Sequence, residues 1–271
     1  MFNRGKYRGA DLSENQPCMF CGLPADSRED IIPTWLTRQD LVPTGTAGPV
    51  KYTSHGETVN QWPSQTLAFL KIKAVCQNCN NTWMSRIEED AKKYLQPMME
   101  GSTIQLDPAA QVELAVWACL KVMVWESVAE GAVTSAEDRE RMWKHQHPPG
   151  YAVVPLGRVP SSDQNEFSLQ QVFIKAQRIP GAQLDNISAT AITLGDFVAW
   201  VILNPTSVQG IHFEPTSIGD DSVTIFPPAF GARQWPPNKT FTVDELRTVW
   251  RRYFVIGEEV RVEHQPESER P

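Results

Sequence analysis

The sequence predicts an α+β protein with a metal-stapled N-terminal region, a helical middle and a sheet-rich C-terminal region. Three observations predict this class. Two C-x-x-C pairs lie within the first 79 residues, apolar residues then recur at helical spacing, and short runs rich in Val, Ile, Phe and Thr follow from residue 151. With 271 residues and 41% hydrophobic composition, the chain can bury an ordinary core.

The first cysteine pair is Cys18 and Cys21, and the second is Cys76 and Cys79. Four thiolates in two such pairs are typical of a tetrahedral zinc site. A reducing cytoplasm favours this use of the cysteines over a disulfide framework. Because four protein ligands fill the coordination sphere, we expect the zinc ion to be structural. Cys119 lies alone in an apolar segment and is expected in the core.

The N-terminal zinc-binding domain is predicted to span residues 11–101. Within it, the Gly/Pro/Thr-rich stretch 42–64 is predicted to be a loop or an insertion. Apolar residues at steps of three and four then indicate an amphipathic helix that begins near Cys79 and ends at Gly101.

Residues 102–149 predict two helices that form a connector packed on the first domain. The first helix is apolar nearly all round between residues 112 and 128, which indicates a buried helix. Its length and its charged residues Glu113, Lys121 and Glu126 argue against a membrane span. The second helix begins at Ser135, with Asp138 as its capping partner.

Residues 150–262 predict a sheet-rich domain whose role the sequence does not identify. The predicted strands are Tyr151–Leu156, Leu169–Ala176, Ile187–Leu194, Phe197–Leu203 and Ser222–Phe226. A last helix is predicted after Thr242, with Glu245 as its capping partner. The polar tail 263–271 is predicted to be disordered.

The charge is unevenly distributed along the chain. Residues 1–101 carry 11 Lys/Arg and 11 Asp/Glu, and the remainder carries 14 and 21. We expect the acidic part to repel nucleic acid, whereas basic residues of the first part could contact phosphate or be ordinary solvated side chains. The polar N-terminus shows no signal or transit peptide, so we expect a cytoplasmic protein without a membrane role.

Three motifs lie close together in the first hundred residues. They are Cys18-Met-Phe-Cys21-Gly22, Glu29-Asp-Ile-Ile-Pro-Thr-Trp35 and Val75-Cys76-Gln-Asn-Cys79-Asn-Asn-Thr-Trp83. Together they resemble the zinc-containing HNH endonucleases, the treble-clef or ββα-metal group. The resemblance covers roughly residues 15–100 and leaves the remaining chain unexplained.

In this family a structural zinc ties a β-hairpin to a helix, and a second divalent ion between them acts on the scissile phosphate. The resemblance implies Glu29 as the hairpin ligand of that magnesium or manganese ion, and Asn80 with Asn81 as the helix ligands. Asp30 falls where the general-base histidine belongs. Since an aspartate has a pKa of about 3.9 and a histidine about 6.5, losing the histidine costs roughly 10²- to 10⁴-fold in general-base catalysis.

Structural interpretations of the same residues remain open. Glu29 and Asp30 also fit the acidic first turn of a helix that leads to Trp35. Asn80 and Asn81 also fit the N-cap of a helix.

The histidines offer two further candidates. His55 lies in the long insertion and either replaces the missing base or is a solvated loop residue. His145 and His147 stand two residues apart, which is more typical of a helix end than of a pair of metal ligands.

Two functional hypotheses follow. The first is a metal-dependent DNA endonuclease of HNH type, whose catalytic ion is held by Glu29, Asp30 and Asn80. The second is an inactive zinc-binding protein on the same frame that engages DNA, or another protein through its C-terminal half. That half contains no G-x-S-x-G, Walker or Rossmann motif. The sequence does not indicate an oligomeric state.

Overall fold

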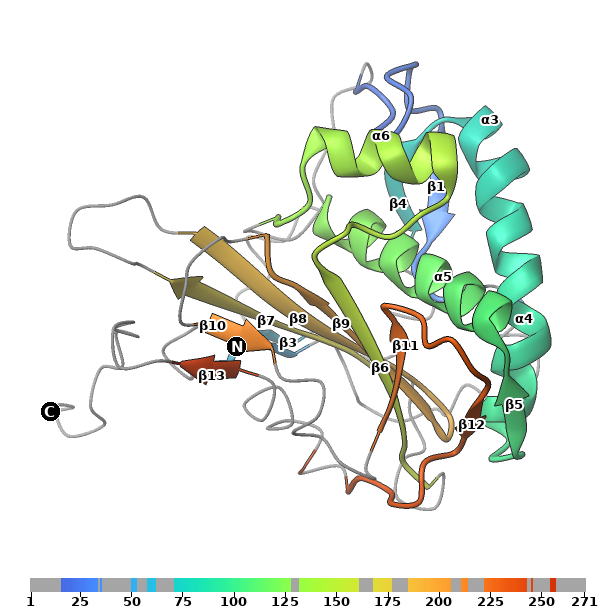
Figure 1. Cartoon of the computed structure of the whole chain (residues 1–271). Coiled ribbons are helices and arrows are strands. Elements are labelled where there is room, and N and C mark those ends of the chain that lie inside the picture. Colours follow the sequence, from blue (N-terminus) through green and yellow to red (C-terminus); the bar gives the residue numbers. More distant parts are fainter. Residues whose placement is uncertain are drawn as a thin grey trace, which may run out of the picture.

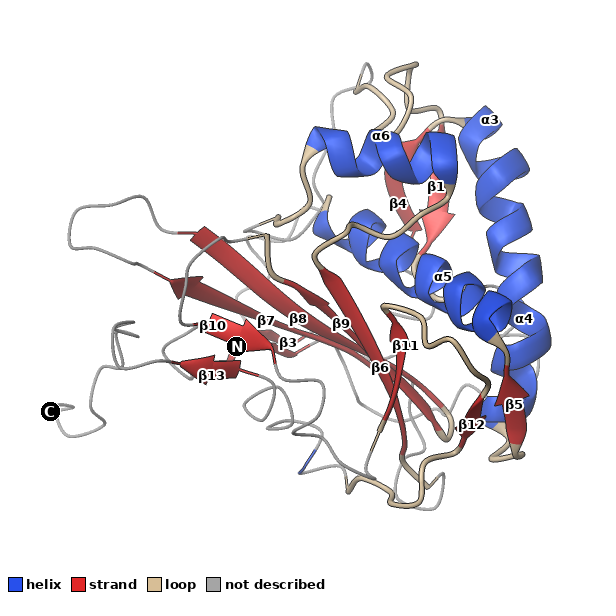
Figure 2. Cartoon of the chain, in the orientation of Figure 1, coloured by secondary structure: helices blue, strands red, loops and turns tan. Residues whose placement is uncertain are grey.

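The structure, a computed structural model, describes residues 16–33, 35, 50–52, 58–61, 71–127, 132–160, 168–176, 185–205, 211–213, 222–242, 245 and 254–256. Within these residues the fold is α+β, as predicted. The helices gather on one side of a seven-stranded sheet, and the cysteine-containing hairpin lies on the same side (Figures 1 and 2).

The large sheet has the strand order β11-β6-β9-β8-β7-β2-β3. All neighbours in it are antiparallel except β2 and β7, which are parallel. Its strands are β2 (Val50–Tyr52), β3 (Thr58–Gln61), β6 (Ala152–Arg158), β7 (Ser168–Ala176), β8 (Asp185–Leu194), β9 (Phe197–Leu203) and β11 (Val223–Phe226). For each strand predicted beyond residue 150, the first and last residues lie within two positions of those of the observed strand. These strands were predictable because their sequences are strongly apolar.

The stretch 42–64 differs from the predicted loop or insertion, because it contains β2 and β3. β2 joins the sheet of the C-terminal half, where Lys51 pairs with Gln171. Both strands are short and one is polar, so the sequence lacks the alternation that marks a strand. β2 forms a strand because it pairs with β7, which lies more than a hundred residues further along the chain.

Helix α5 (Pro108–Glu126) runs through the middle of the protein, between α4 (Ser85–Met99) and the sheet strands β9 and β11 (Figure 1). It begins with Asp107, whose side chain accepts a hydrogen bond of 2.8 Å from the Ala110 amide. By length and composition α5 could cross a membrane, but 78% of its apolar window is buried inside the protein. It is therefore the core helix that the sequence predicts.

The helical segment after the second cysteine pair comprises α3 (Gln77–Cys79), the π-helical turn η1 (Asn80–Met84) and α4 (Ser85–Met99). The predicted amphipathic face is buried, and the helix ends before Gly101, whose φ of +77° favours glycine. Helix α6 (Ala136–His145) begins with the predicted capping box of Ser135 and Asp138. His145 is its last residue, as predicted for a histidine at a helix end.

Three two-stranded sheets complete the described fold. They are β1 (Ser27–Asp30) with β4 (Lys71–Val75), β5 (Ile104–Leu106) with β12 (Arg233–Trp235), and β10 (Ile211–Phe213) with β13 (Phe254–Ile256). One hydrophobic cluster extends from Cys18 to Trp235 and so crosses the predicted domain boundaries after residues 101 and 149.

Two predictions concern the C-terminal end of the chain. The capping pair of Thr242 and Glu245 is present: the Thr242 amide donates to Glu245 Oε2 at 2.9 Å, and the Glu245 amide donates to Thr242 Oγ1 at 3.2 Å. The helix predicted after this pair and the tail 263–271 lie outside the described residues.

Candidate functional site

The four predicted cysteine ligands converge on one point. The sulfur atoms of Cys18, Cys21, Cys76 and Cys79 all lie within 4.8 Å of one another, and the Sγ atoms of Cys21 and Cys76 are 3.5 Å apart. Zn–S bonds of about 2.3 Å in a tetrahedron place sulfur atoms about 3.8 Å apart. The cluster therefore has the dimensions of a metal site, and four cysteines so close together could bind a metal such as zinc.

Local backbone structure positions each pair. In the first pair the Gly22 amide donates to the Cys18 carbonyl at 2.9 Å, and the φ of +76° at Gly22 is one that glycine adopts without strain. In the second pair Cys76 is the N-cap of the helical segment, and its Sγ accepts from the Cys79 amide at 3.4 Å. One pair thus sits in a tight turn and the other at a helix start.

The surroundings of the cysteines fit a bound cation. Burial raises the pKa of the Cys79 thiol, so a nearby positive charge is needed to keep this thiolate at neutral pH. The rings of Phe20 and Trp83 pack edge to face beside the pairs, with centroids 5.0 Å apart. Thiolate ligands are soft, and such a set selects zinc over magnesium or calcium.

Glu29 and Asp30 lie on strand β1, so the alternative interpretation as a helix start is wrong. In the hairpin, Glu29 is opposite Ile72 and Asp30 is opposite Lys71. Successive side chains of a strand point to opposite faces. Glu29 accordingly points inward and is 4% exposed, whereas Asp30 lies toward the surface.

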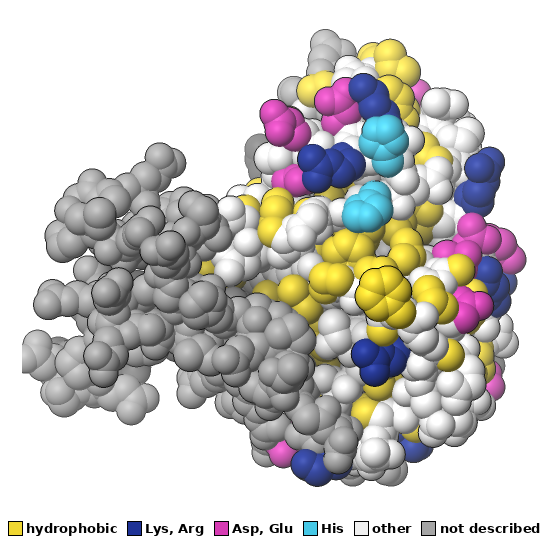
Figure 3. Space-filling model, in the orientation of Figure 1, with side chains coloured by type: hydrophobic (Ala, Val, Ile, Leu, Met, Phe, Trp, Pro, Cys, Tyr) yellow, Lys and Arg dark blue, Asp and Glu magenta, His cyan; other side chains and the backbone are white. Residues whose placement is uncertain are grey.

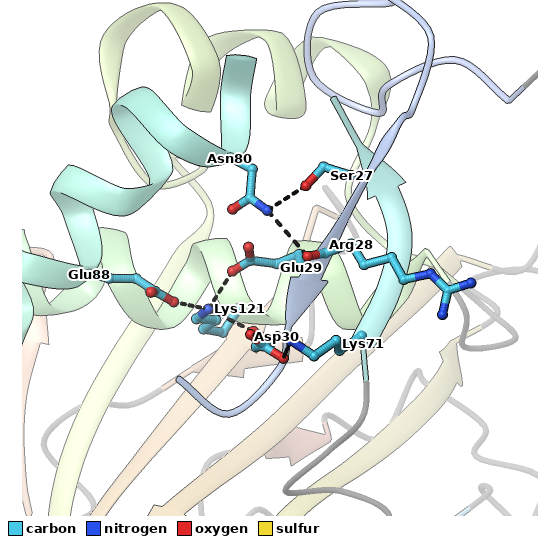
Figure 4. Close-up of polar contacts among 8 residues, drawn as sticks. All are labelled: Ser27, Arg28, Glu29, Asp30, Lys71, Asn80, Glu88 and Lys121. Atoms are coloured by element: carbon cyan, nitrogen blue, oxygen red, sulfur yellow. Dashed lines mark hydrogen bonds and ion pairs between the residues drawn. The ribbon is translucent and has the colours of Figure 1, made fainter. Parts of the chain in front are cut away.

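The buried Glu29 carboxylate already has a cationic partner, Lys121 of helix α5. The Lys121 ammonium donates to Glu29 Oε1 at 2.6 Å, to the Asp30 carbonyl at 2.9 Å and to Glu88 Oε1 (Figure 4). The Lys121 side chain is 1% exposed. An ammonium has three protons to donate, and all three are directed to protein oxygens here. We call Glu29, Glu88 and Lys121 the buried ion cluster.

The two carboxylates of this cluster favour the charged form of Lys121, although they repel each other. Burial would lower the pKa of Lys121, but the Glu29 and Glu88 carboxylates outweigh it and hold that pKa above its usual value. Burial raises the pKa of Glu29, and the Lys121 ammonium opposes that rise. The cluster therefore contains a permanent positive charge among three oxygen atoms from β1 and α4.

Asp30 is paired on the other face of the hairpin. Lys71 Nζ lies 3.0 Å from Asp30 Oδ1, and the two side chains are 48% and 21% exposed. A surface pair of this kind contributes little to stability. Asp30, which the resemblance places at the general-base position, thus pairs with Lys71 on the face of β1 opposite to the Glu29 side chain.

Asn80 and Asn81 have different environments. The Asn80 side chain donates to Ser27 Oγ at 2.9 Å and to the Arg28 carbonyl at 3.2 Å, so it meets β1 directly before Glu29 (Figure 4). Asn81 is exposed. The N-cap function that was the alternative for these residues belongs to Cys76. Asn80, the first residue of the π-helical turn η1, therefore contacts the two residues that precede Glu29 on β1. Such turns are frequent at functional sites.

Sequence reasoning missed Glu88 and Lys121 as members of this site. The available signal was a lysine inside a helix that is otherwise apolar, since a buried lysine requires a charged partner. Which carboxylates would serve could not be read from spacing. The candidate base His55 lies outside the described residues.

Comparisons with protein-family models, with curated proteins and with solved structures found no match for this chain. The cysteine cluster and the buried ion cluster are therefore the features of this chain that bear on its function.

Proposed function

We propose that this protein is a zinc-stapled, HNH-like DNA-binding protein that does not hydrolyse DNA. The observation that carries the proposal is the ion pair of 2.6 Å between Lys121 and Glu29. A catalytic magnesium or manganese ion would need the Glu29 carboxylate as a ligand. To admit that ion, the Lys121 ammonium would have to leave its partners while remaining 1% exposed, which is strongly unfavourable for a buried charge.

The frame itself supports the HNH-like part of the proposal. A cysteine-containing turn, the paired strands β1 and β4, and a helix that starts at the second cysteine pair are the parts that a treble clef would use. The Met19 amide donates to the Ala74 carbonyl at 2.9 Å and ties the turn to the hairpin. Zinc is the ion we assign, because four thiolates close a tetrahedral structural site.

The general base is the second missing component. Asp30 is a weaker base than histidine at neutral pH, and its carboxylate is held by Lys71. The Lys121 ammonium can neutralise the charge of Glu29, but it cannot lower the pKa of a bound water as a metal ion does. The residues at this site thus provide neither of the two groups that activate water in the family.

DNA is the partner that the charge of the hairpin favours. The outward face of the hairpin carries Arg28, Lys71 and Lys73 against a single carboxylate, Asp30. The Arg28 side chain extends away from the buried ion cluster (Figure 4). On a chain with a formal charge of −7, this cationic strip offers a local contact for phosphates.

Fluorescence anisotropy with duplex DNA at several salt concentrations tests the binding. We expect Arg28→Gln to weaken binding and to reduce the slope of log K against log salt by about 0.9, the value for one phosphate contact. Lys144→Gln is the charge-matched control on exposed helix α6 and should leave that slope unchanged. Equal effects of the two variants, or no DNA binding by the wild type, would contradict the proposal.

Hydrolysis of DNA is the second candidate function, and the position of Asn80 favours it. Asn80 meets β1 beside Glu29, as the resemblance implies for the two metal ligands. This candidate requires the Lys121 ammonium to leave Glu29 when a divalent ion binds. It predicts metal-dependent nicking of plasmid DNA that disappears in Glu29→Gln.

A further inference from the structure

The four cysteines of the cluster differ in their access to solvent. Cys18, Cys76 and Cys79 are buried and at most 4% exposed, whereas Cys21 is only partly buried. Residues 22–24, which follow Cys21 directly, are all exposed. The side of the cluster at Cys21 is therefore the one nearest to solvent.

The turn that carries Cys21 lies at one end of the molecule. In Figure 1 it belongs to the dark-blue segment at the top of the view, above helix α6. In the space-filling view of Figure 3, hydrophobic side chains reach the surface at the same end. Leu23 of this turn is 55% exposed. A small dissolved reagent thus has a short path from water to Cys21.

A second sulfur atom lies close to that of Cys21. The Sγ atoms of Cys21 and Cys76 are 3.5 Å apart, although the residues belong to different C-x-x-C pairs. The sulfur atoms of a disulfide are about 2.0 Å apart, so a movement of about 1.5 Å would join these two. The exposed member of the cluster therefore has a buried partner within reach.

The ligands of a zinc ion are also reactive groups. Zinc binds cysteine as the thiolate, which is the form that attacks peroxides. Among thiolates, those with access to solvent are oxidised first. A structural zinc site uses four protein ligands, so the loss of two of them releases the ion.

We propose that Cys21 is an oxidative modification site, at which a peroxide converts Cys21 and Cys76 into a disulfide and releases the zinc ion. The Cys21 thiolate attacks one peroxide oxygen, the O–O bond breaks, and hydroxide leaves behind a cysteine sulfenic acid. The Cys76 thiolate then attacks that sulfur, and the S–O bond breaks with loss of a second hydroxide. The two thiolates lose two electrons in total, and two protons from solvent turn the two hydroxides into water.

This oxidation rests on the zinc ion that we assign to the cluster under the proposed function, and it does not depend on DNA binding. The disulfide joins the same two segments that zinc joins, the turn at Cys21 and the helix start at Cys76. The ligands therefore stay close together while the ion is absent. A dithiol reductant and added zinc should rebuild the site.

Hydrogen peroxide added to the zinc-loaded full chain tests the modification, with a chromogenic zinc indicator as the readout. Cys119→Ala lies outside the cluster and should release zinc at the wild-type rate. Cys21→His keeps a zinc ligand at this position but removes the partly exposed thiolate. It should release zinc at least about tenfold more slowly than the wild type.

Peptide mapping by mass spectrometry gives a second readout that needs no variant. After oxidation of the wild type, the tryptic peptides 9–28 and 74–86 should be joined by a disulfide between Cys21 and Cys76. Cys119 should remain reduced, because it is buried outside the cluster. Dithiothreitol with zinc should separate the two peptides and restore the zinc content.

Three results would overturn the proposal while leaving the zinc assignment intact. They are a wild type that keeps its zinc in peroxide, release by Cys21→His at the wild-type rate, and disulfides that form only within each C-x-x-C pair. A wild type purified without zinc would overturn the zinc assignment and this proposal together.

Discussion

The ammonium of Lys121 lies 2.6 Å from the carboxylate of Glu29, although the two residues are 92 positions apart in the chain. This contact joins the central helix α5 to strand β1, and Glu88 extends it to α4. The same contact fastens the hairpin to the core and occupies the carboxylate on which metal-dependent hydrolysis would rely.

Removing the ammonium should strongly destabilise the protein. In Lys121→Met the aliphatic chain is retained, but two carboxylates are left together without a cation. We expect the free energy of unfolding to fall by about 3–5 kcal/mol, measured by urea denaturation. The double variant Lys121→Met with Glu29→Gln should lose less than the sum of the two single variants. Lys144→Met, which breaks an exposed pair with Glu140, is the control and should change stability by less than about 0.5 kcal/mol.

A divalent ion should be able to replace the ammonium once space is made for it. In Lys121→Ala, the oxygens of Glu29, Glu88 and the Asp30 carbonyl become available to a hard cation. We expect added manganese to raise the Tm of Lys121→Ala and to leave the wild-type Tm unchanged. The rise should be lost when Glu29→Gln is added. An equal rise in the wild type would contradict the assignment of Lys121 as the resident cation.

The cysteine cluster should hold one zinc ion that the fold requires. Elemental analysis should give one zinc per chain for the wild type and much less for Cys79→Ser. Cys119→Ala changes a buried cysteine outside the cluster and should keep the zinc. A strong chelator should lower the Tm of the wild type and of Cys119→Ala alike. Full zinc content in Cys79→Ser would disprove the four-cysteine site.

Acid should selectively weaken the contact between helix α6 and Tyr151, the residue directly before β6. Burial would raise the pKa of Asp138, but hydrogen bonds from Tyr151 and Ser135 outweigh it and lower that pKa below its usual value. The ionised carboxylate therefore stabilises the folded state above about pH 4, the unfolded value, and this contribution is lost as the pH falls through the lower folded pKa.

The variant Asp138→Asn isolates this effect. At neutral pH it should cost about 1–3 kcal/mol, because the carboxylate accepts from Ser135 Oγ at 2.7 Å and from the Tyr151 hydroxyl at 2.5 Å. The difference from the wild type, followed by urea denaturation, should shrink below about pH 4. A difference that stays constant down to the lowest measurable pH would rule out a charged Asp138 as the cause.

The sequence predicted the features that local patterns encode. The apolar run of α5, the capping box at Ser135 and the strand β9 all appear where periodicity and capping place them. The cysteine spacing likewise predicted the cluster. These features depend on a few neighbouring residues, so a window of the chain is sufficient to detect them.

Features that depend on distant partners were not predictable in this way. β2 is a strand because β7 pairs with it, and Glu29 is neutralised because α5 brings Lys121 to it. The resemblance implies that Glu29 and Asn80 are metal ligands, but it carries no information about a lysine on another helix. The cysteine spacing therefore predicted the cluster, whereas the chemistry we propose depends on tertiary contacts.

Incubation of plasmid DNA with the wild-type protein and magnesium or manganese shows whether Glu29 can take a catalytic metal ion in place of Lys121. The protein should be added at concentrations that saturate binding in the anisotropy experiment. We expect bound but uncut plasmid with either metal. Metal-dependent nicking by the wild type that disappears in Glu29→Gln would contradict it, and would show that the Lys121 ammonium gives way to a catalytic ion.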